Sequence, residues 1–228
     1  MLRTEAQSAV GFDSKIGGYA AGRATRDALI VTAQRLFAVR GIDAVSLREV
    51  ASAAGTRNTA AAQYYFGNKE ALLLEIFRRR STDIAARRMA LLEEVAASPD
   101  PMAAIADALI RPLADQIGDE GFLMFLARCQ SDHVRSDGIL GEDISGTFRR
   151  TRKLMRAQLP GLSGPLFSRR FDLAVKSAVT ALAGVEWRKC VRNQEIDVDE
   201  MVTDLIDVVC AMMQAPSTRP TTRRKVRR

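Results

Sequence analysis

Apolar residues recur three and four positions apart near the start of the chain, which is the spacing of one face of an α-helix. The first such segment opens at Thr25, a residue type found at helix N-caps, and stops at Gly41, a residue type common just beyond a helix. A second segment opens at Ser46, where Ser46 and Glu49 have the S-x-x-E spacing of a capping box, and stops at Gly55. The pattern predicts two short amphipathic helices.

Two more helices follow at short intervals. A third is predicted from about Asn58 to Tyr65, and a fourth opens at Asn68 and continues past Phe77. The tight connections, with a turn that begins at Gly55, are the layout of a helix-turn-helix module. Beyond about residue 78 the helical spacing continues without a strand-like alternation. The sequence therefore predicts an all-α fold, with an N-terminal three-helix helix-turn-helix domain followed by a larger helical domain.

The expected domain boundaries follow from composition and helical spacing. Residues 1–24 are rich in Gly, Ala and Ser without an apolar period and indicate a flexible arm. Residues 25–77 form the helix-turn-helix domain, residues 78–214 the second helical domain, and residues 215–228 a basic, disordered tail. No apolar run approaches the roughly 18 to 20 residues of a membrane span, and no signal-peptide core opens the chain. We therefore expect a cytoplasmic protein that has no membrane partner.

Composition and charge narrow this picture only slightly. The chain has 228 residues, of which 47% are hydrophobic, enough for a substantial core. Its net charge of +7 suggests a nucleic-acid binder, but most of that excess lies in the tail "PSTRPTTRRKVRR", which contains no acidic residue. The net charge is therefore weak support for DNA binding, and a prediction of DNA binding has to depend on local sequence features.

Residues that perform metal or catalytic chemistry are sparse. Cys129, Cys190 and Cys210 are far apart and form no CxxC pair, and His133 is the one histidine. We therefore expect neither a metal site nor a cofactor. The chain also contains no G-x-S-x-G, Walker or G-x-G-x-x-G motif, so we do not expect an enzyme.

The strongest signal is the combination of two stretches, "ALIVTAQRLFAVRGIDAVSLREVASAAG" and "QYYFGNKEALL". Over roughly residues 25–77 they resemble the DNA-binding domain of the TetR family of transcriptional regulators. The match includes the serine that opens the second helix, the AxxAG stretch that ends at Gly55, and the aromatic-x-x-Lys-Glu pattern that begins at Phe66. One residue more than the commonest family spacing separates Gly55 from Phe66, and we place it near Thr56 or Arg57.

The resemblance makes the third helix the recognition helix, which enters the major groove of DNA. Small alanines on its groove face would let the backbone approach the bases, while Gln63 would bond base edges and Arg57 a guanine or a phosphate. The alternative is that the alanines only favour helix and the polar residues are only solvated. The predicted contacts here are Arg57, Asn58, Thr59, Ala60, Ala61 and Gln63.

Side chains around the end of the third helix are predicted to hold the DNA backbone. Tyr64 and Tyr65 would bond phosphate oxygens through their hydroxyls, with a place in the core as the alternative for Tyr65. Phe66 has no polar atom and is expected to lock the third helix against the first and fourth. Lys69 stands at the positive N-terminus of the fourth helix, an unfavourable position that a nearby phosphate would explain. Ser46 serves as an N-cap, as a phosphate contact, or as both.

Two apolar helices near the C-terminus predict a dimer. "PLFSRRFDLAVKSAVTALAGVEWRKC" and "DVDEMVTDLIDVVCAMMQ" have wide apolar faces, which suit a four-helix bundle shared by two subunits, as the family dimerises. An intramolecular core is the alternative. The predicted interface residues are Phe171, Val175, Ala178, Leu182, Val185, Met201, Leu205, Val208 and Met212.

The helices between these regions are predicted to be buried, because apolar residues surround "PMAAIADALIRPLADQI" and "EGFLMFLARCQSDHV". The resemblance implies that such middle helices enclose an effector pocket. Its predicted lining residues, for which ordinary core is the alternative, are Phe122, Met124, Phe125, Met155 and Trp187. The basic run over residues 149–156 is either a solvated face or a site for an acidic ligand.

We therefore expect a homodimeric, sequence-specific transcriptional regulator, a repressor that binds palindromic half-sites of a double-stranded DNA operator. The resemblance implies that a small-molecule effector in the second domain releases it from the operator. The alternative function is that of a helical interaction protein or ligand sensor without specific DNA binding. The extra residue in the turn after Gly55 is the one feature that favours it.

Overall fold

The computed structural model describes residues 6–118, 120–131 and 146–216, with side chains from residue 21 onward. Over those ranges the regular elements are helices and no strand occurs, as the apolar spacing predicted. None of the helices described there is long and apolar enough to cross a bilayer. His133 and most of the predicted basic tail lie outside the described residues.

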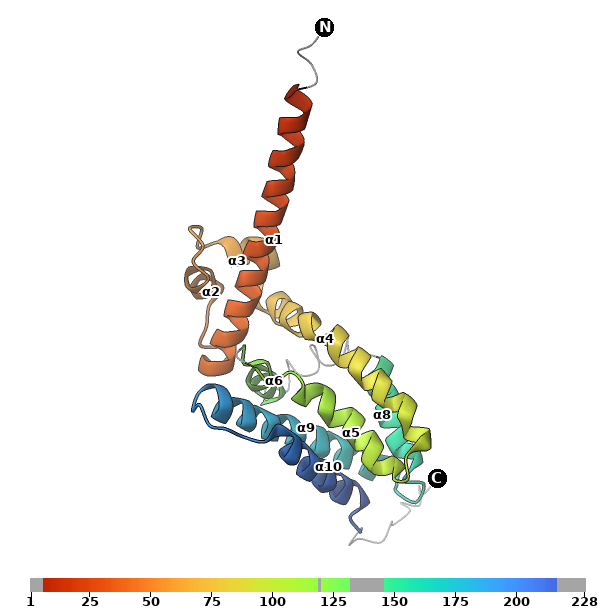
Figure 1. Ribbon diagram of the computed structural model, residues 1–228. Coiled ribbons are helices and arrows are strands. Elements are labelled where there is room, and N and C mark those ends of the chain that lie inside the picture. The colour runs from red at the N-terminus through yellow and green to blue at the C-terminus, as the bar shows by residue number, and fades with distance from the viewer. Residues whose placement is uncertain (1–5, 119, 132–145, 217–228) are drawn as a thin grey trace, which may run out of the picture. The chain divides into compact units, whose positions relative to one another are not determined.

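The chain divides into two compact units, residues 1–79 and residues 80–228, at a point inside helix α4 (Lys69–Glu94). Besides the start of α4, the first unit contains α1 (Ala6–Arg40), α2 (Leu47–Ala53) and α3 (Ala61–Phe66) (Figure 1). All four helices contribute to its apolar core, which includes Leu29, Ile30, Ala33, Phe37, Val50, Ala51, Ala62, Phe66, Leu72, Leu73 and Ile76. In α1 and α4 these residues recur three and four positions apart, which is the spacing from which the helices were predicted.

Helix α1 begins well before its predicted start. A flexible arm over residues 1–24 with an N-cap at Thr25 is wrong for the described part of that range, because α1 is continuous from Ala6. The Thr25 hydroxyl donates to the carbonyl of Ala21 at 2.9 Å, which is the bond of a residue inside a helix. The segment before Thr25 contains no proline, so no residue in it stops the helix, although its glycines lower the helix propensity and it has no apolar stripe.

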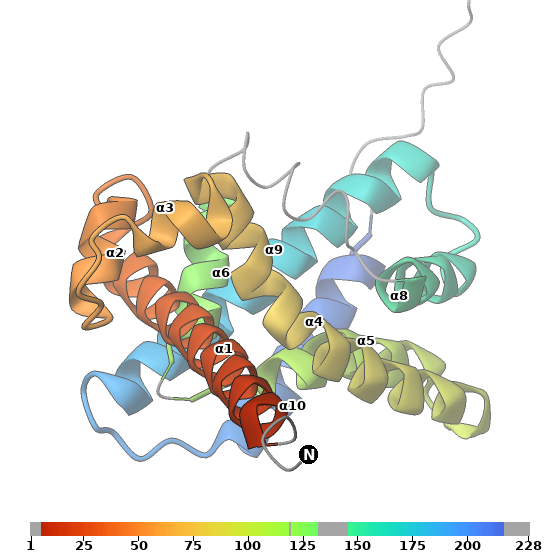
Figure 2. The same ribbon diagram turned by 90° about the horizontal axis from the view of Figure 1, so that it is seen from above.

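The second unit is a bundle built on a long helix, α9. Its elements are the end of α4, the 3-10 turn η1 (Val95–Ala97), α5 (Pro101–Ala114), α6 (Phe122–Ser131), α8 (Gly146–Ala157), α9 (Gly164–Cys190) and α10 (Val198–Gln214). Helix α9 packs against α5, α6 and α10, and α5 also packs against α8 (Figures 1 and 2). Asp100 and Asp197 cap α5 and α10, each accepting a backbone N–H at 3.0 Å.

The central apolar stripe of α9 is buried within the single chain. Phe171, Ala178, Leu182 and Val185 are at most 1% exposed, and Leu205 on α10 is also buried. Because helices of the same chain already pack on α9, these residues form an intramolecular core. This corrects their prediction as contacts to a second subunit.

Candidate nucleic-acid interface

Helix α2 begins with the predicted capping box. Ser46 Oγ accepts the N–H of Glu49 at 3.2 Å, and the Glu49 carboxylate accepts the N–H of Ser46 at 2.8 Å. The Ser46 N–H and hydroxyl, together with Arg40 at 3.0 Å, lower the pKa of Glu49 to about 2. Ser46 therefore acts as the N-cap, and its side chain remains exposed at the start of the helix.

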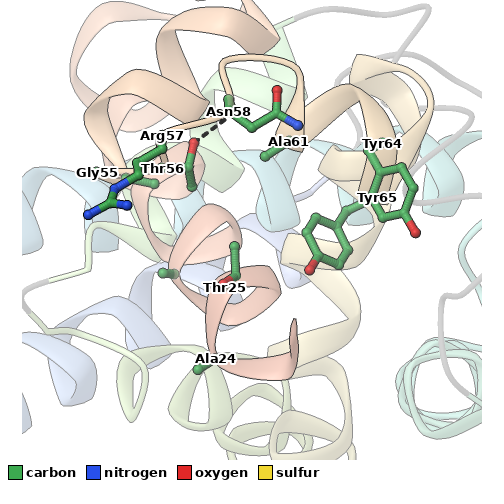
Figure 3. A pocket seen from close by; sticks show the side chains of 11 residues that line it. Ala24, Thr25, Gly55, Thr56, Arg57, Asn58, Ala61, Tyr64 and Tyr65 are labelled. Atoms are coloured by element: carbon green, nitrogen blue, oxygen red, sulfur yellow. Dashed lines mark hydrogen bonds between the residues drawn. The ribbon is translucent and has the colours of Figure 1, made fainter. Parts of the chain in front are cut away.

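Gly55 ends α2 in a left-handed conformation, with φ of 71°. Its N–H donates to the carbonyl of Ser52 at 3.1 Å, and the N–H of Thr56 donates to the carbonyl of Ala51 at 3.2 Å. These two bonds form a Schellman motif, which reverses the chain toward α3. The Thr56 hydroxyl lies 2.8 Å from the Ala51 carbonyl and 2.9 Å from that of Asn58, so it ties the turn to α2 (Figure 3).

Replacing Gly55 by Ala is expected to lower the free energy of unfolding by about 1 kcal/mol, because a side chain is strained at positive φ. Strain alone causes the loss, since an added Cβ would have nothing within 4 Å. Urea denaturation measures it, with Gly164→Ala as the control, because Gly164 has equal space and no positive φ. Equal stability of the two variants would show that the turn does not impose this conformation.

Helix α3 starts later than predicted, at Ala61 rather than near Asn58. Asn58 Oδ1 accepts the N–H of Ala60 at 2.9 Å, an Asx turn that satisfies the backbone without a helix. Asn58, Thr59 and Ala60 therefore form an exposed turn in front of α3. At this point the hydrogen bond accepted by the Asn58 side chain outweighs the helix propensity of the alanines.

The three alanines do not share one face. Ala60 is exposed, whereas Ala61 is 7% exposed and Ala62 is fully buried. The prediction that Ala61 faces DNA is wrong, because a helix that begins at this residue turns its methyl group toward the core. Ala62 also packs in the core of the first unit.

The exposed polar side chains of the turn and α3 belong to Arg57, Asn58, Thr59 and Gln63. The Gln63 amide donates to the carbonyl of Gly67, which holds the side chain along α3. A primary amide has two N–H donors and one acceptor oxygen, so Gln63 keeps one of each for an adenine edge. The structure therefore brings the predicted base-reading residues into one exposed row, with Ala61 left out.

The two tyrosines of α3 have different surroundings. Tyr64 is 82% exposed, and its ring meets that of Tyr65 edge to face at 5.3 Å. Tyr65 is half-buried, and its hydroxyl lies beside Gly22 of α1, where an added Cβ would be 3.5 Å away. Tyr64 is therefore open to a DNA strand, whereas Tyr65 also packs against α1.

Phe66 is the aromatic residue that packs α3 against α1. It is buried, and the guanidinium of Arg26 on α1 lies 5.4 Å from the centre of its ring. Arg26 in turn pairs with Glu75 on α4, which also pairs with Arg78 at 3.2 Å. Arg26 and Arg78 lower the pKa of Glu75, against the opposing effect of burial. Phe66 thus links α3 to Arg26 of α1, and Arg26 links α1 to Glu75 of α4.

Lys69 has a partner within the protein. Its Nζ donates to the carbonyl of Ile42 at 2.9 Å, so the ammonium stabilises the connection after α1. This bond explains a cation at the positive end of α4 without a phosphate, although two N–H donors remain on the ammonium. The predicted N-cap of α4 is confirmed, since Asn68 Oδ1 accepts the N–H of Ala71 at 2.8 Å.

An open pocket of about 630 Å³ lies beside the exposed row. Figure 3 shows α1 on one side of it and the turn with α3 on the other. Its lining residues are Ala24, Thr25, Ala28, Ala54, Gly55, Thr56, Arg57, Asn58, Ala61, Tyr64 and Tyr65. The pocket makes the surface concave next to residues that carry hydrogen-bonding groups.

Two family models match the chain. Residues 29–76 match "Bacterial regulatory proteins, tetR family", and residues 103–212 match "Tetracyclin repressor-like, C-terminal domain". Together they cover more than half of the chain. The chain belongs to the TetR family of transcriptional regulators. It is therefore a DNA-binding regulator with a ligand-binding C-terminal domain, in a family that is not enzymatic.

Solved structures share the TetR fold at low sequence identity. A transcriptional regulator from Rhodococcus sp. Rha1 is 22% identical, over 82% of this chain and 95% of that chain, with a TM-score of 0.51. The TetR-family regulator PfmR from Thermus thermophilus is 20% identical, over 80% of this chain and 96% of that chain, with a TM-score of 0.50. No curated protein sequence matches the chain. Identities this low show a common fold and say nothing of the ligand.

The predicted effector-pocket residues of this TetR-family chain are dispersed. Phe122, Phe125 and Met155 are fully buried, and Met124 is half-buried. Trp187 is 41% exposed under the guanidinium of Arg192, 4.9 Å from its ring centre. Trp187 therefore lies at the surface and does not line either described pocket, and its role in an effector pocket stays a prediction.

A described pocket of the second unit lies elsewhere, between α4, η1 and α5. It has a volume of about 400 Å³ and is lined by Leu91, Glu94, Ala97, Ser98, Ala104 and Asp107. None of the predicted lining residues belongs to it, so it does not support their assignment.

Two buried charged residues were missed from the sequence. Glu186, on α9, is fully buried, and its Oε2 accepts the N–H of Met124 in the first turn of α6 at 2.8 Å. Burial raises the pKa of Glu186 to about 7, although the α6 backbone N–H groups oppose the shift. Arg88, on α4, is the second. Each interrupts an apolar stripe with a charge, and that interruption is the signal by which they could have been found.

Proposed function

We propose that this TetR-family regulator is a cytoplasmic homodimeric repressor, which binds a palindromic operator and is released by a small-molecule effector. The observation that carries the proposal is the exposed polar row on the turn and α3, held in place by the Gly55 turn and by buried Phe66. A recognition surface has to be rigid and accessible at once, because base contacts require defined side-chain positions.

Within this proposal the base contacts come from Arg57, Thr59 and Gln63. Gln63 pairs with adenine, Arg57 with a guanine or a phosphate, and Ala60 contacts a thymine methyl. Asn58 contributes mainly by shaping the turn, since its side chain accepts the N–H of Ala60. The extra residue of this turn lies where the chain leaves α2, so it changes the approach to α3 rather than α3 itself.

The proposed phosphate contacts surround that row. Tyr64 is the best placed, because most of its ring and hydroxyl are exposed. Ser46 contributes through its exposed side chain at the start of α2, although its N–H and hydroxyl also bond Glu49. Lys69 and Tyr65 contribute more weakly, since Lys69 already bonds the Ile42 carbonyl and Tyr65 packs beside Gly22 of α1.

Replacing Gln63 by Ala is expected to weaken binding to the preferred operator by about 1 to 3 kcal/mol and to relax the base preference at one position in each half-site. The physical reason is the loss of a bidentate contact to a base edge. Fluorescence anisotropy with labelled operator DNA measures the loss at fixed salt concentration. A loss of the same size on unrelated DNA would place Gln63 on the backbone instead.

The proposed dimer uses the faces of α9 and α10 that the single chain leaves accessible. Val208 is 44% exposed and Leu173 is 56% exposed, which is unusual for large apolar side chains on two adjacent helices. Met201 and Met212 on α10 and Val175 on α9 are half-buried. Two copies are required by the DNA geometry, because half-sites lie about 34 Å apart along the duplex.

Competition binding on the protein's own promoter region tests this function. The purified protein is expected to retard a promoter fragment in excess nonspecific DNA, and sedimentation should show a dimer on the fragment. A protein that binds the promoter no better than scrambled DNA would favour the alternative, a helical sensor without specific DNA binding.

A further inference from the structure

A buried arginine of the second unit, Arg88, has no acidic partner among the residues that the structure describes. Arg88 is 4% exposed, and its Nε donates to the carbonyl of Ala108 on α5 at 3.1 Å. Its guanidinium carbon lies 5.7 Å from the centre of the Phe148 ring on α8. Among the described residues no carboxylate forms an ion pair with it. Groups from α5 and α8 thus pack on a cation of α4 that the described fold does not neutralise.

Other arginines of the second unit are paired with a carboxylate. Arg87, the preceding residue, pairs with Asp115 at 3.2 Å, although it is largely exposed. Arg111, which is more buried, pairs with Asp107 at 2.7 Å. Arg88 is more buried than Arg87 and Arg111 and would gain more from a carboxylate, because ion pairing matters most where water is excluded, yet no described carboxylate pairs with it.

The guanidinium of Arg88 remains charged at neutral pH. Burial lowers its pKa only to about 10, well above the pH at which the protein works. Of its five N–H donors, the one on Nε is used by Ala108, and the two terminal nitrogens form a planar fork. Such a fork matches the two oxygens of a carboxylate, and a buried cation without an anion is unfavourable for the unliganded protein.

The residues around the Arg88 guanidinium supply further positive charge and an aromatic surface. The Phe148 ring packs on that of Phe171 at 5.6 Å, and the Arg152 guanidinium lies 5.6 Å from the Phe171 ring. No ion pair to a described carboxylate is formed by the basic residues of α8, which are Arg149, Arg150, Arg152, Lys153 and Arg156. Arg88 is therefore a buried cation beside this basic run, for which the sequence analysis left a site for an acidic ligand as one of two interpretations.

We propose that Arg88 recognises the effector of this regulator, and that the effector is a carboxylate carried on an apolar body. The two carboxylate oxygens accept from the terminal nitrogens of Arg88, and the apolar body lies against the aromatic rings beside it. The proposal rests on the function proposed above, because it names the ligand class of the C-terminal domain.

Matched acids and amides test this assignment. Octanoate and benzoate, with octanamide and benzamide as neutral partners of the same shape, are titrated into the purified full-length protein by calorimetry. We expect at least one acid to bind the wild-type protein roughly tenfold or more tightly than its amide. Arg88→Met should remove that preference, and Arg88→Lys should retain part of it because the charge remains without the fork.

Arg87→Met is the control, since it removes a neighbouring positive charge that already has a partner. It should keep the preference for the acid, and cooperative thermal unfolding shows that each variant is folded. Failure of both acids to bind, equal affinity for acid and amide, or an unchanged preference in Arg88→Met overturns the proposal. Promoter binding by the unliganded wild-type protein is measured separately, so a failure of the proposed function is distinguished from a failure of this one.

Discussion

Replacing Phe66 by Ala is expected to lower the free energy of unfolding by about 3 to 5 kcal/mol, the range for removing a large buried aromatic side chain. Phe66 is the buried residue through which α3 contacts Arg26, and Arg26 also pairs with Glu75. The variant loses the apolar area of the ring, and the Arg26 guanidinium loses the aromatic face beneath it. The exposed row on α3 then loses its support, so operator affinity should fall as well.

Urea denaturation followed by circular dichroism measures the effect of Phe66→Ala on stability. Tyr64→Ala is the matched control, because Tyr64 is an aromatic residue on the same short helix and is 82% exposed. We expect the control to change the free energy of unfolding by less than about 0.5 kcal/mol, as exposed substitutions usually do. Equal losses in the two variants would mean that Phe66 does not hold α3 in place.

A change of pH should alter the stability of the protein through Glu186. Burial raises the pKa of this carboxyl to about 7, above the ordinary value of 4.5 that we assign to the unfolded chain. The contribution to stability is fully present below pH 4.5 and is lost as the pH rises to about 7, because the unfolded chain releases the proton first. The expected loss is about 3 kcal/mol between those two pH values.

The difference between wild-type protein and Glu186→Gln isolates this contribution, since glutamine stays neutral and all other titrating groups are shared. Urea denaturation across the pH range from acid to neutral should show the wild type losing stability relative to the variant as the pH rises. A difference that stays constant with pH would mean that the α6 backbone N–H groups keep Glu186 ionised throughout.

Local sequence rules were sufficient where the contacts are local. The capping box at Ser46, the left-handed stop at Gly55 and the N-cap at Asn68 each depend on a few neighbouring residues, and each is present in the structure. The inward faces of the first unit also follow from helical spacing alone. The start of α1 was missed because the apolar spacing begins only near Thr25, whereas the helix extends back to Ala6 through a segment without proline.

Features that depend on tertiary packing were not predictable in the same way. Periodicity finds the apolar stripe of α9 but cannot tell whether α5 and α10 or a second subunit covers it, and Leu182 proves to be covered within the chain. The position of Ala61 depends on a helix start that an Asx turn at Asn58 delays by a few residues. That no described carboxylate pairs with Arg88 depends on how α4, α5 and α8 pack together, which the spacing within one segment of sequence cannot predict.

The most direct test of the central claim is selection of binding sites from random double-stranded DNA by the wild-type protein and by Gln63→Ala. If the exposed row on the turn and α3 reads bases from two subunits, the wild type selects a two-fold symmetric sequence with half-sites about one helical turn apart. Gln63→Ala then loses base preference at one position in each half-site and keeps the rest. Selection of no common sequence, of an asymmetric one, or of the same sequence by both proteins would contradict this account.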